Sequence, residues 1–356
     1  MEKECALHKE NIDCTGDKVQ RKRTRKAMSK VTLLLLAFGV LSYFSAFLEV
    51  PFGELFQRLI AFILEKSGQN SAYSYFVAKI IVNSSAFLSY ITLFVFFVCI
   101  ALPAYIFSKC VKLSDEDSFN LHGKAAKKWM CLFGFCQIVT MFASALSQGC
   151  CDFLFPDGIA SASSGIVPVF SPEIDVFGFL LETLCVAVFV PFTEEYVFRG
   201  VIFGYLKRYG IIFAVVASAA VFGAAHSTPV QSVYAFSFGI VAAVATVVTG
   251  NLRTSILFHA MNNFLNVIYK YSPSFFEEMG YDIVFALIQT VIVVLGVVGL
   301  YLFVKKDGMS DSFSTIIKEE QNGESYVAGI REILTVPFVL YLVIYGVMFA
   351  LTVMTA

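Results

Sequence analysis

The chain has 356 residues, of which 58% are hydrophobic and 15% charged, and its formal net charge is −1. Soluble domains carry about 45–50% apolar and about 25% charged residues, so this composition excludes an ordinary soluble domain and predicts a protein that crosses the membrane several times. The near-neutral charge also argues against a nucleic-acid partner.

Apolar segments alternate with charged loops along the whole chain. Residues 1–30 are polar, and seven Lys or Arg residues lie between positions 18 and 30, so the positive-inside rule predicts a cytoplasmic tail. The amphipathic stretch 51–68 predicts a helix at the membrane surface. The predicted transmembrane spans are 31–48, 84–107, 129–146, 175–208, 211–226, 233–248, 254–269, 283–304 and 334–354. The pattern predicts an all-α, polytopic membrane protein with eight or nine transmembrane helices.

The span at 175–208 contains the octapeptide Thr193–Gly200, with three ionisable residues. Each would cost about 2.5–3.5 kcal/mol at the middle of a membrane, so such a cluster indicates a functional site. Glu195 and Arg199 are four residues apart on one helical face and are predicted to pair. Glu194 points about 100° away and lacks that partner. The simpler alternative is a salt bridge at the membrane edge.

Two later spans each carry a histidine. Phe222 and His226 are four residues apart, as are His259 and Asn263, so each pair shares one helical face. A single histidine in an apolar span is more often a hydrogen-bonded core residue than a catalyst. Two of them, with an aligned asparagine and an unpaired Glu194 on separate spans, favour a catalytic site enclosed by the transmembrane helices.

The three motifs Glu-Glu-x-x-x-Arg, Phe-x-x-x-His and His-x-x-x-Asn occur in this order on successive spans, between about residues 175 and 269. The ordered set resembles the CPBP intramembrane endopeptidases. This superfamily includes the type II CAAX prenyl endopeptidases and the bacteriocin-processing or self-immunity proteins. The resemblance implies an enzyme that hydrolyses a peptide bond of a membrane-associated or lipidated substrate.

The resemblance also implies a role for each motif residue. Glu194 would activate a water molecule as general base with help from His226, and His259 and Asn263 would stabilise the oxyanion. The remaining motif residues would support this constellation structurally: Glu195, Arg199 and Phe222.

The catalytic type stays open between a glutamate and a metallo-endopeptidase. Two histidines and a carboxylate, His226, His259 and Glu194, could bind Zn²⁺. The chain has no His-Glu-x-x-His pair, and a metal-free mechanism would use the same residues. No other cofactor is expected.

The motifs divide the chain into four predicted regions. They are a basic cytoplasmic tail at 1–30, N-terminal transmembrane helices with the interfacial segment at 31–173, a catalytic core at 174–270 and C-terminal transmembrane helices at 271–356. We expect a multi-pass protein of a bacterial cell membrane with its N-terminus in the cytoplasm. Its partners would be membrane lipids and a membrane-bound, prenylated or leader-peptide substrate. The alternatives are a non-catalytic membrane scaffold or bacteriocin self-immunity factor and, behind these, a transporter.

Overall fold

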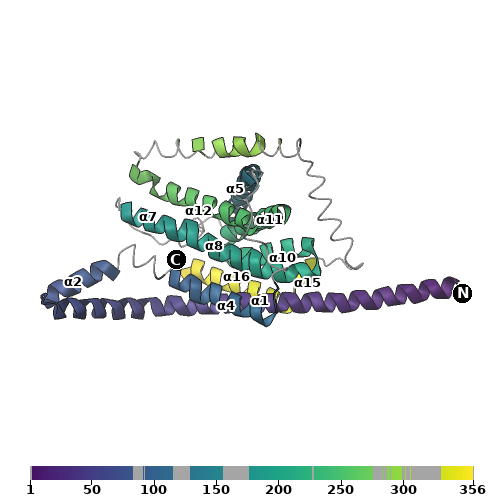
Figure 1. Cartoon of the computed structure of the whole chain (residues 1–356), viewed down its shortest axis with the longest axis horizontal. Helices are drawn as coiled ribbons and strands as arrows, with labels where there is room; N and C mark the ends of the chain where they lie inside the picture. Colours follow the sequence, from purple (N-terminus) through teal and green to yellow (C-terminus); the bar gives the residue numbers. More distant parts are fainter. Residues whose placement is uncertain are drawn as a thin grey trace.

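Helices make up the fold. The computed structural model describes residues 2–82, 91, 93–114, 129–154, 176–226, 228–275, 283, 287–288, 290–298, 301, 305 and 330–355. These residues form helices and no β-strand, which confirms the all-α prediction. Figure 1 shows the longest helix, α1, along the lower edge of the molecule with most of the other helices above it.

The N-terminal part is one helix instead of several segments. α1 runs without a break over 65 residues, Glu2–Lys66, so the predicted span at 31–48 and the predicted surface helix at 51–68 are parts of one continuous helix. The chain reverses only at Gly68, whose φ of 94° few other residues adopt. α2 (Ser71–Val82), which the hydropathy pattern did not predict, then packs back along α1.

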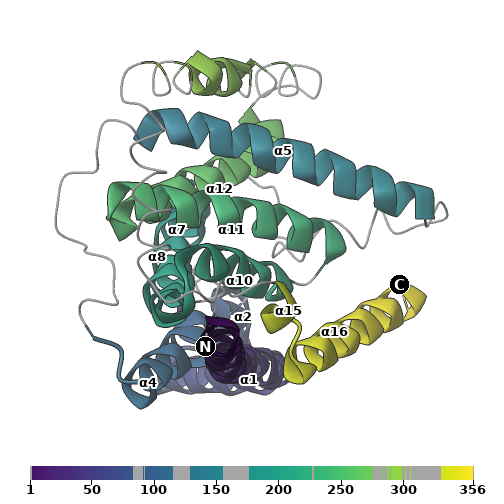
Figure 2. The ribbon, with the colours of Figure 1, turned by 90° about the vertical axis from the view of Figure 1, so that its right-hand side faces the viewer.

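The remaining helices form layers above α1. Figure 2 shows α10 above α1 and α4, then α11 and α12, and then α5. α11 packs against both α10 and α5, so it lies at the centre of the bundle. The helix bounds are η1 (Phe96–Ala101), α4 (Leu102–Cys110), α5 (Trp129–Leu154), α10 (Ile211–Ala224), α11 (Pro229–Thr249), α12 (Leu252–Phe275), α15 (Ile330–Ile333) and α16 (Val336–Thr355).

The span with the Glu-Glu-x-x-x-Arg motif is helical throughout but changes its winding. It includes two π-helical segments, which are rare in proteins and are frequent at functional sites. Its parts are α7 (Val176–Leu184), η2 (Cys185–Phe189), α8 (Val190–Glu195), η3 (Tyr196–Phe203), α9 (Gly204–Leu206) and η4 (Lys207–Tyr209). Pro191, where a kink was predicted, is the second residue of α8 and lies two residues after the end of the first π-helical segment.

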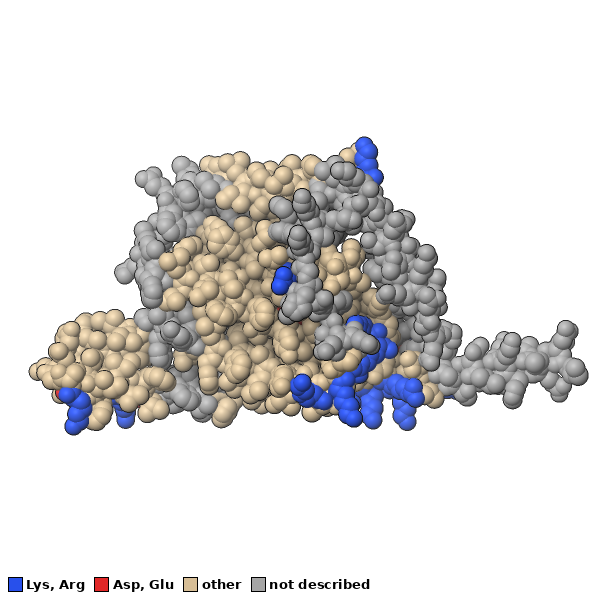
Figure 3. Space-filling model, viewed as in Figure 1, with Lys and Arg blue, Asp and Glu red and all other residues tan. Residues whose placement is uncertain are grey.

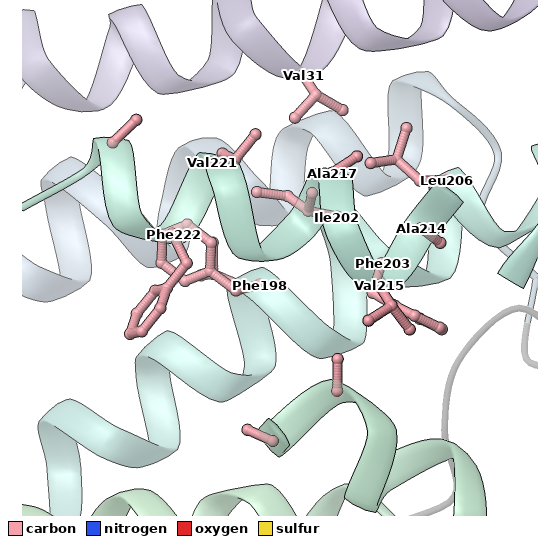
Figure 4. Packing of buried hydrophobic residues seen from close by; sticks show 14 of the residues in the cluster. Val31, Phe198, Ile202, Phe203, Leu206, Ala214, Val215, Ala217, Val221 and Phe222 are labelled. Carbon is pink, nitrogen blue, oxygen red and sulfur yellow. The ribbon is translucent and has the colours of Figure 1, made fainter. Parts of the chain in front are cut away.

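The core lies between α1, the motif span and α10. Figure 4 shows Val31 of α1 close to Ile202 and Ala217, which belong to η3 and α10. Val31, Ile202 and Ala217 have no exposed surface. The apolar part of α1 is therefore fixed against the motif-bearing helices.

Local capping explains where the central helices begin and end. α10 ends at Ala224, two residues before the predicted end of its span, so His226 lies outside the helix. Thr228 caps α11 by accepting a hydrogen bond from the Gln231 backbone N–H at 3.2 Å, and Pro229 takes the first helical position that suits it. Gly250 ends α11 in the left-handed conformation, as the predicted turn requires.

Two helical stretches in the described part of the chain are long and apolar enough to cross a membrane, Leu93–Cys110 and Pro229–Thr249. The total of eight or nine spans therefore stays a prediction, as do the four predicted regions. Only parts of the predicted span 283–304 belong to the described residues, and residues 84–90 of the second span lie outside them.

Candidate active site

The centre of the site is a buried cluster of charged residues. Arg199 Nη1 donates to Glu195 Oε1 at 2.7 Å, the pair that the four-residue spacing predicts. Nδ1 of His259 contacts the same oxygen at 2.9 Å, which brings α12 against the motif span. Glu195 and Arg199 are at most 1% exposed, and His259 is 6% exposed. A buried carboxylate held by two such donors is firmly fixed in position.

Glu194 lies beside this cluster rather than away from it. Its Oε2 is 3.6 Å from Nε2 of His259, although the helical spacing suggested that it would point elsewhere. The two neighbouring carboxylates reach one imidazole because its two nitrogens lie on different sides of the ring. The Glu194 side chain keeps 14% of its surface exposed, whereas that of Glu195 keeps none. Glu194 is thus the carboxylate of the pair that solvent can reach.

Phe222 packs at the meeting point of the three motifs. The Arg199 guanidinium lies over its ring at 4.5 Å, an arrangement that offsets part of the cost of burying the charge. The same ring has edge contacts with His226 at 4.8 Å and with His259 at 5.8 Å between ring centroids. Phe222 therefore keeps the two imidazoles and the guanidinium in fixed positions relative to one another.

His226 occupies the turn between α10 and α11. Its Nδ1 lies 2.8 Å from the carbonyl oxygen of Phe222, and because a carbonyl only accepts, Nδ1 carries the proton. In the neutral ring, Nε2 is then left as an acceptor. The side chain is half-buried and lies within electrostatic reach of Glu194.

Asn263 fills a gap that Pro191 makes in the motif span. In η2 the hydrogen bonds reach five residues back, and the Val190 N–H bonds to the Cys185 carbonyl. The next carbonyl, that of Val186, would pair with residue 191, but proline has no N–H. Nδ2 of Asn263 donates to the Val186 carbonyl at 2.9 Å instead. Asn263 thereby joins α12 to the helix that carries Glu194, and one N–H of its amide is taken by this contact.

Sequence reasoning missed a polar network behind Asn263. The Asn262 carbonyl oxygen accepts hydrogen bonds from the Tyr234 hydroxyl and, at 3.3 Å, from the Gln137 amide. The Asn262 amide in turn lies 3.5 Å from Oδ1 of Asn263. Polar residues inside the apolar spans of α5 and α11 were the available signal, because such groups need partners away from water.

The proposed metal ligands do not form a metal site in this arrangement. Among the described residues, no group of three or more His, Cys, Asp or Glu side chains could hold a metal ion. Of the three candidates, His259 has Nδ1 bonded to Glu195, which leaves Nε2 beside Glu194, and His226 has Nδ1 bonded to a carbonyl. We therefore derive no chemical step through a metal.

Comparison with known proteins identifies the motif-bearing part of the chain. Residues 176–265 match the family model described as type II CAAX prenyl endopeptidase Rce1-like, which confirms the resemblance to the CPBP family. This is a family of membrane-integral proteases. No curated protein and no solved structure matches the chain. The matched residues include all three motifs and end before α15 and α16.

Proposed function

Because residues 176–265 form an Rce1-like domain, we propose that this protein is an intramembrane endopeptidase that hydrolyses a peptide bond of a lipidated, membrane-bound substrate. The observation that carries the proposal is the convergence of Glu194 and Glu195 on His259, with Arg199 paired to Glu195 and His226 beside the cluster. Buried charges on separate helices are costly inside a membrane and are there by default for function.

Glu194 is the general base in this proposal. It is the accessible carboxylate, and it is free of the direct arginine contact that fixes Glu195. A water molecule between Glu194 and Nε2 of His226 would lose one proton to the carboxylate, while its oxygen attacks the scissile carbonyl carbon and forms an oxyanion. Collapse of this oxyanion would break the C–N bond, and the proton held by Glu194 would pass to the leaving amine. The free acceptor on His226 would orient that water and support the proton transfer. General-base catalysis of this kind contributes about 10²–10⁴-fold to a rate.

His259 stabilises the oxyanion that forms on the scissile carbonyl. When both of its nitrogens carry protons, its charge and that of Arg199 balance the two carboxylates, so the cluster is neutral as a whole. The Nε2 proton, directed toward Glu194 at 3.6 Å, can then serve the developing negative charge. Asn263 would contribute its second N–H while the first keeps its bond to Val186. Glu195, Arg199 and Phe222 hold these groups in place.

The substrate class follows from the family description and from the surroundings of the site. A prenyl group attached to a cysteine near the C-terminus anchors a protein to the membrane, where a protease of this kind would meet it. The exposed apolar side chains of α11, α12 and α16, such as Val233, Leu257 and Val343, suit contact with lipid tails. Membrane lipids are therefore the surroundings from which the substrate enters.

We also propose that the N-terminus lies in the cytoplasm, as in a bacterial cell membrane. Figure 3 shows Lys and Arg side chains gathered along one part of α1. On the same side of the fold, Arg208 donates to the Val111 and Lys112 carbonyls at the end of α4, which itself packs on α1. This grouping supports a cytoplasmic face by the positive-inside rule. A cysteine placed at the exposed Lys22, in a cysteine-free background, should react with impermeant thiol reagents from the cytoplasmic side alone.

The test of the proposed function is a cleavage assay with the purified protein in lipid bilayers. A peptide that ends in a farnesylated Cys-aliphatic-aliphatic-X sequence should lose the residues after the cysteine, as mass spectrometry would detect. The same peptide without farnesyl is the control for the substrate class. Glu194→Ala should abolish cleavage. Cleavage of both peptides at equal rates would contradict the preference for a prenylated substrate. An active Glu194→Ala variant would exclude Glu194 as the general base.

A further inference from the structure

The C-terminal helix α16 contacts the turn that carries His226, although it lies outside the Rce1-like domain. The Tyr341 hydroxyl donates to the Ala224 carbonyl at 2.8 Å. One helical turn further along, the Tyr345 hydroxyl lies 3.2 Å from Oγ of Ser232. Ser232 Oγ also lies 3.3 Å from the His226 carbonyl and donates to it. Both tyrosines therefore reach the ends of the His226 turn.

This turn needs such support because it lies between two helix ends. The last four carbonyls of a helix have no partner within it, and the Ala224 carbonyl is one of them in α10. Tyr341 supplies its donor. The His226 carbonyl lies beyond the helix and receives its donor from Ser232. The backbone on one side of His226 is thus held by Tyr341 of α16, and on the other side by Ser232 of α11, which Tyr345 of α16 contacts.

The geometry of the turn decides where the imidazole points. Nδ1 of His226 bonds to the Phe222 carbonyl, so the ring orientation follows the backbone between residues 222 and 226. Close packing fixes that backbone from the other side, because a side chain added at Gly223 would lie 2.7 Å from the Ser232 carbonyl. A small shift of the turn would move Nε2 of His226 relative to Glu194.

α16 has its own anchor in the N-terminal helix. Glu332, in α15 directly before α16, pairs with Arg21 of α1 at 3.1 Å, and Phe338 is 3% exposed. The opposite side of α16 is apolar and exposed, with Leu340, Val343 and Val347 all more than half exposed. Figure 2 shows α16 extending outward from the bundle. The two tyrosine hydroxyls are therefore specific links from an edge helix to the site.

We propose that Tyr341 and Tyr345 are positioning residues, which hold the His226 turn so that Nε2 of the imidazole faces the water that Glu194 activates. The inference rests on the proposed function and extends it to a helix outside the Rce1-like domain. The two hydroxyls act through His226 and do not touch the substrate. If they served only to attach α16, their loss would lower stability and leave the catalytic rate unchanged.

The test compares Tyr341→Phe, Tyr345→Phe and the double variant with Tyr75→Phe, an exposed tyrosine of α2, as control. Removal of either hydroxyl alone should lower kcat about tenfold. The double variant should lose about 100-fold, which is the cost of misplacing a catalytic group by about 1 Å. KM should stay within about twofold of the wild type, since the substrate contacts are intact. Hydrogen exchange of the backbone amides at 224–232 should speed up in the variants, while that of 252–265 should not.

His226→Ala, measured in parallel, separates this inference from the proposed function. An inactive His226→Ala variant beside tyrosine variants with wild-type kcat would overturn the positioning role and leave the protease assignment standing. A lower unfolding temperature with unchanged kcat would also overturn it, because the tyrosines would then be anchors only. A fully active His226→Ala variant would overturn both the assignment of His226 and the inference built on it.

Discussion

The two histidines of the candidate site are held in different ways. His259 is buried in the N-terminal half of α12, and its two nitrogens face two carboxylates. His226 lies in a turn beyond the end of α10, half-buried, and its contacts are to backbone carbonyls and an aromatic ring. We call His259 with Glu194, Glu195 and Arg199 the deep half of the site, which is fixed by charge and burial. We call His226 and its turn the shallow half, which is fixed by local backbone geometry. In the proposed mechanism, the deep half stabilises the developing charge, and the shallow half admits water and substrate.

The largest effect is expected where the deep half is broken. His259→Ala removes the imidazole that lies between Glu194 and Glu195, and Glu195 Oε1 loses one of its two contacts in a buried site. Leaving a buried polar group without its partner costs about 1–3 kcal/mol, and more for a charged group. Activity should fall below detection, and the unfolding temperature in detergent should fall as well. Wild-type thermal stability in His259→Ala would contradict the charge-based account of the deep half.

A mutation in the shallow half should lower activity and leave thermal stability unchanged. His226→Ala removes an imidazole whose hydrogen bond is local and whose position is half-buried. We expect a loss of about 10²–10⁴-fold in kcat, the usual contribution of an acid–base group, with the unfolding temperature close to that of the wild type. Side-by-side thermal unfolding of His226→Ala and His259→Ala provides the check. Equal destabilisation of the two variants would contradict the proposal that the two histidines are held in different ways.

Asn263 tests how the deep half is joined to the helix of Glu194. Asn263→Ala leaves the Val186 carbonyl without the donor that Pro191 cannot supply. An unsatisfied buried carbonyl costs about 1–3 kcal/mol, so stability and activity should both fall. Asn266→Ala, an exposed asparagine on the same helix, is the matched control. If the two variants unfold at the same temperature, the hydrogen bond from Asn263 to the Val186 carbonyl contributes nothing to stability.

The smallest effect on stability is expected from Thr228, which lies next to the His226 turn. Thr228 caps α11 directly after the His226 turn, and replacement of such a cap by alanine costs about 1 kcal/mol. Thr228→Ser, which keeps the hydroxyl, should restore wild-type behaviour. Measured by chemical unfolding, a Thr228→Ala variant as stable as Thr228→Ser would show that this cap does not hold the turn.

Periodicity in the sequence predicted the features that lie within a single helix. The four-residue spacing of Glu195 and Arg199 places them on one face, and their ion pair forms as expected. The turn at Gly250 follows in the same way from local conformational preference. The order of the three motifs predicted the family of residues 176–265.

Contacts between helices could not be predicted in this way. Whether Glu194 meets His259 depends on how α8 packs on α12, which no periodicity encodes. The contacts of Tyr341 and Tyr345 with the His226 turn join residues more than 100 positions apart. The continuity of α1 between residues 48 and 51 was not predicted, because the apolar stretch and the amphipathic stretch on either side differ in pattern.

The central claim is that two adjacent glutamates, both close to His259, have different roles, and Glu194→Gln and Glu195→Gln test it most directly. Each change removes one charge and keeps the size of the side chain. Glu194→Gln should abolish cleavage of the farnesylated peptide and unfold at the wild-type temperature, because its side chain is partly accessible. Glu195→Gln should unfold at a clearly lower temperature, because it leaves the charge of Arg199 buried without its partner. Peptidase activity retained in Glu194→Gln, or equal stability of the two variants, would contradict the account.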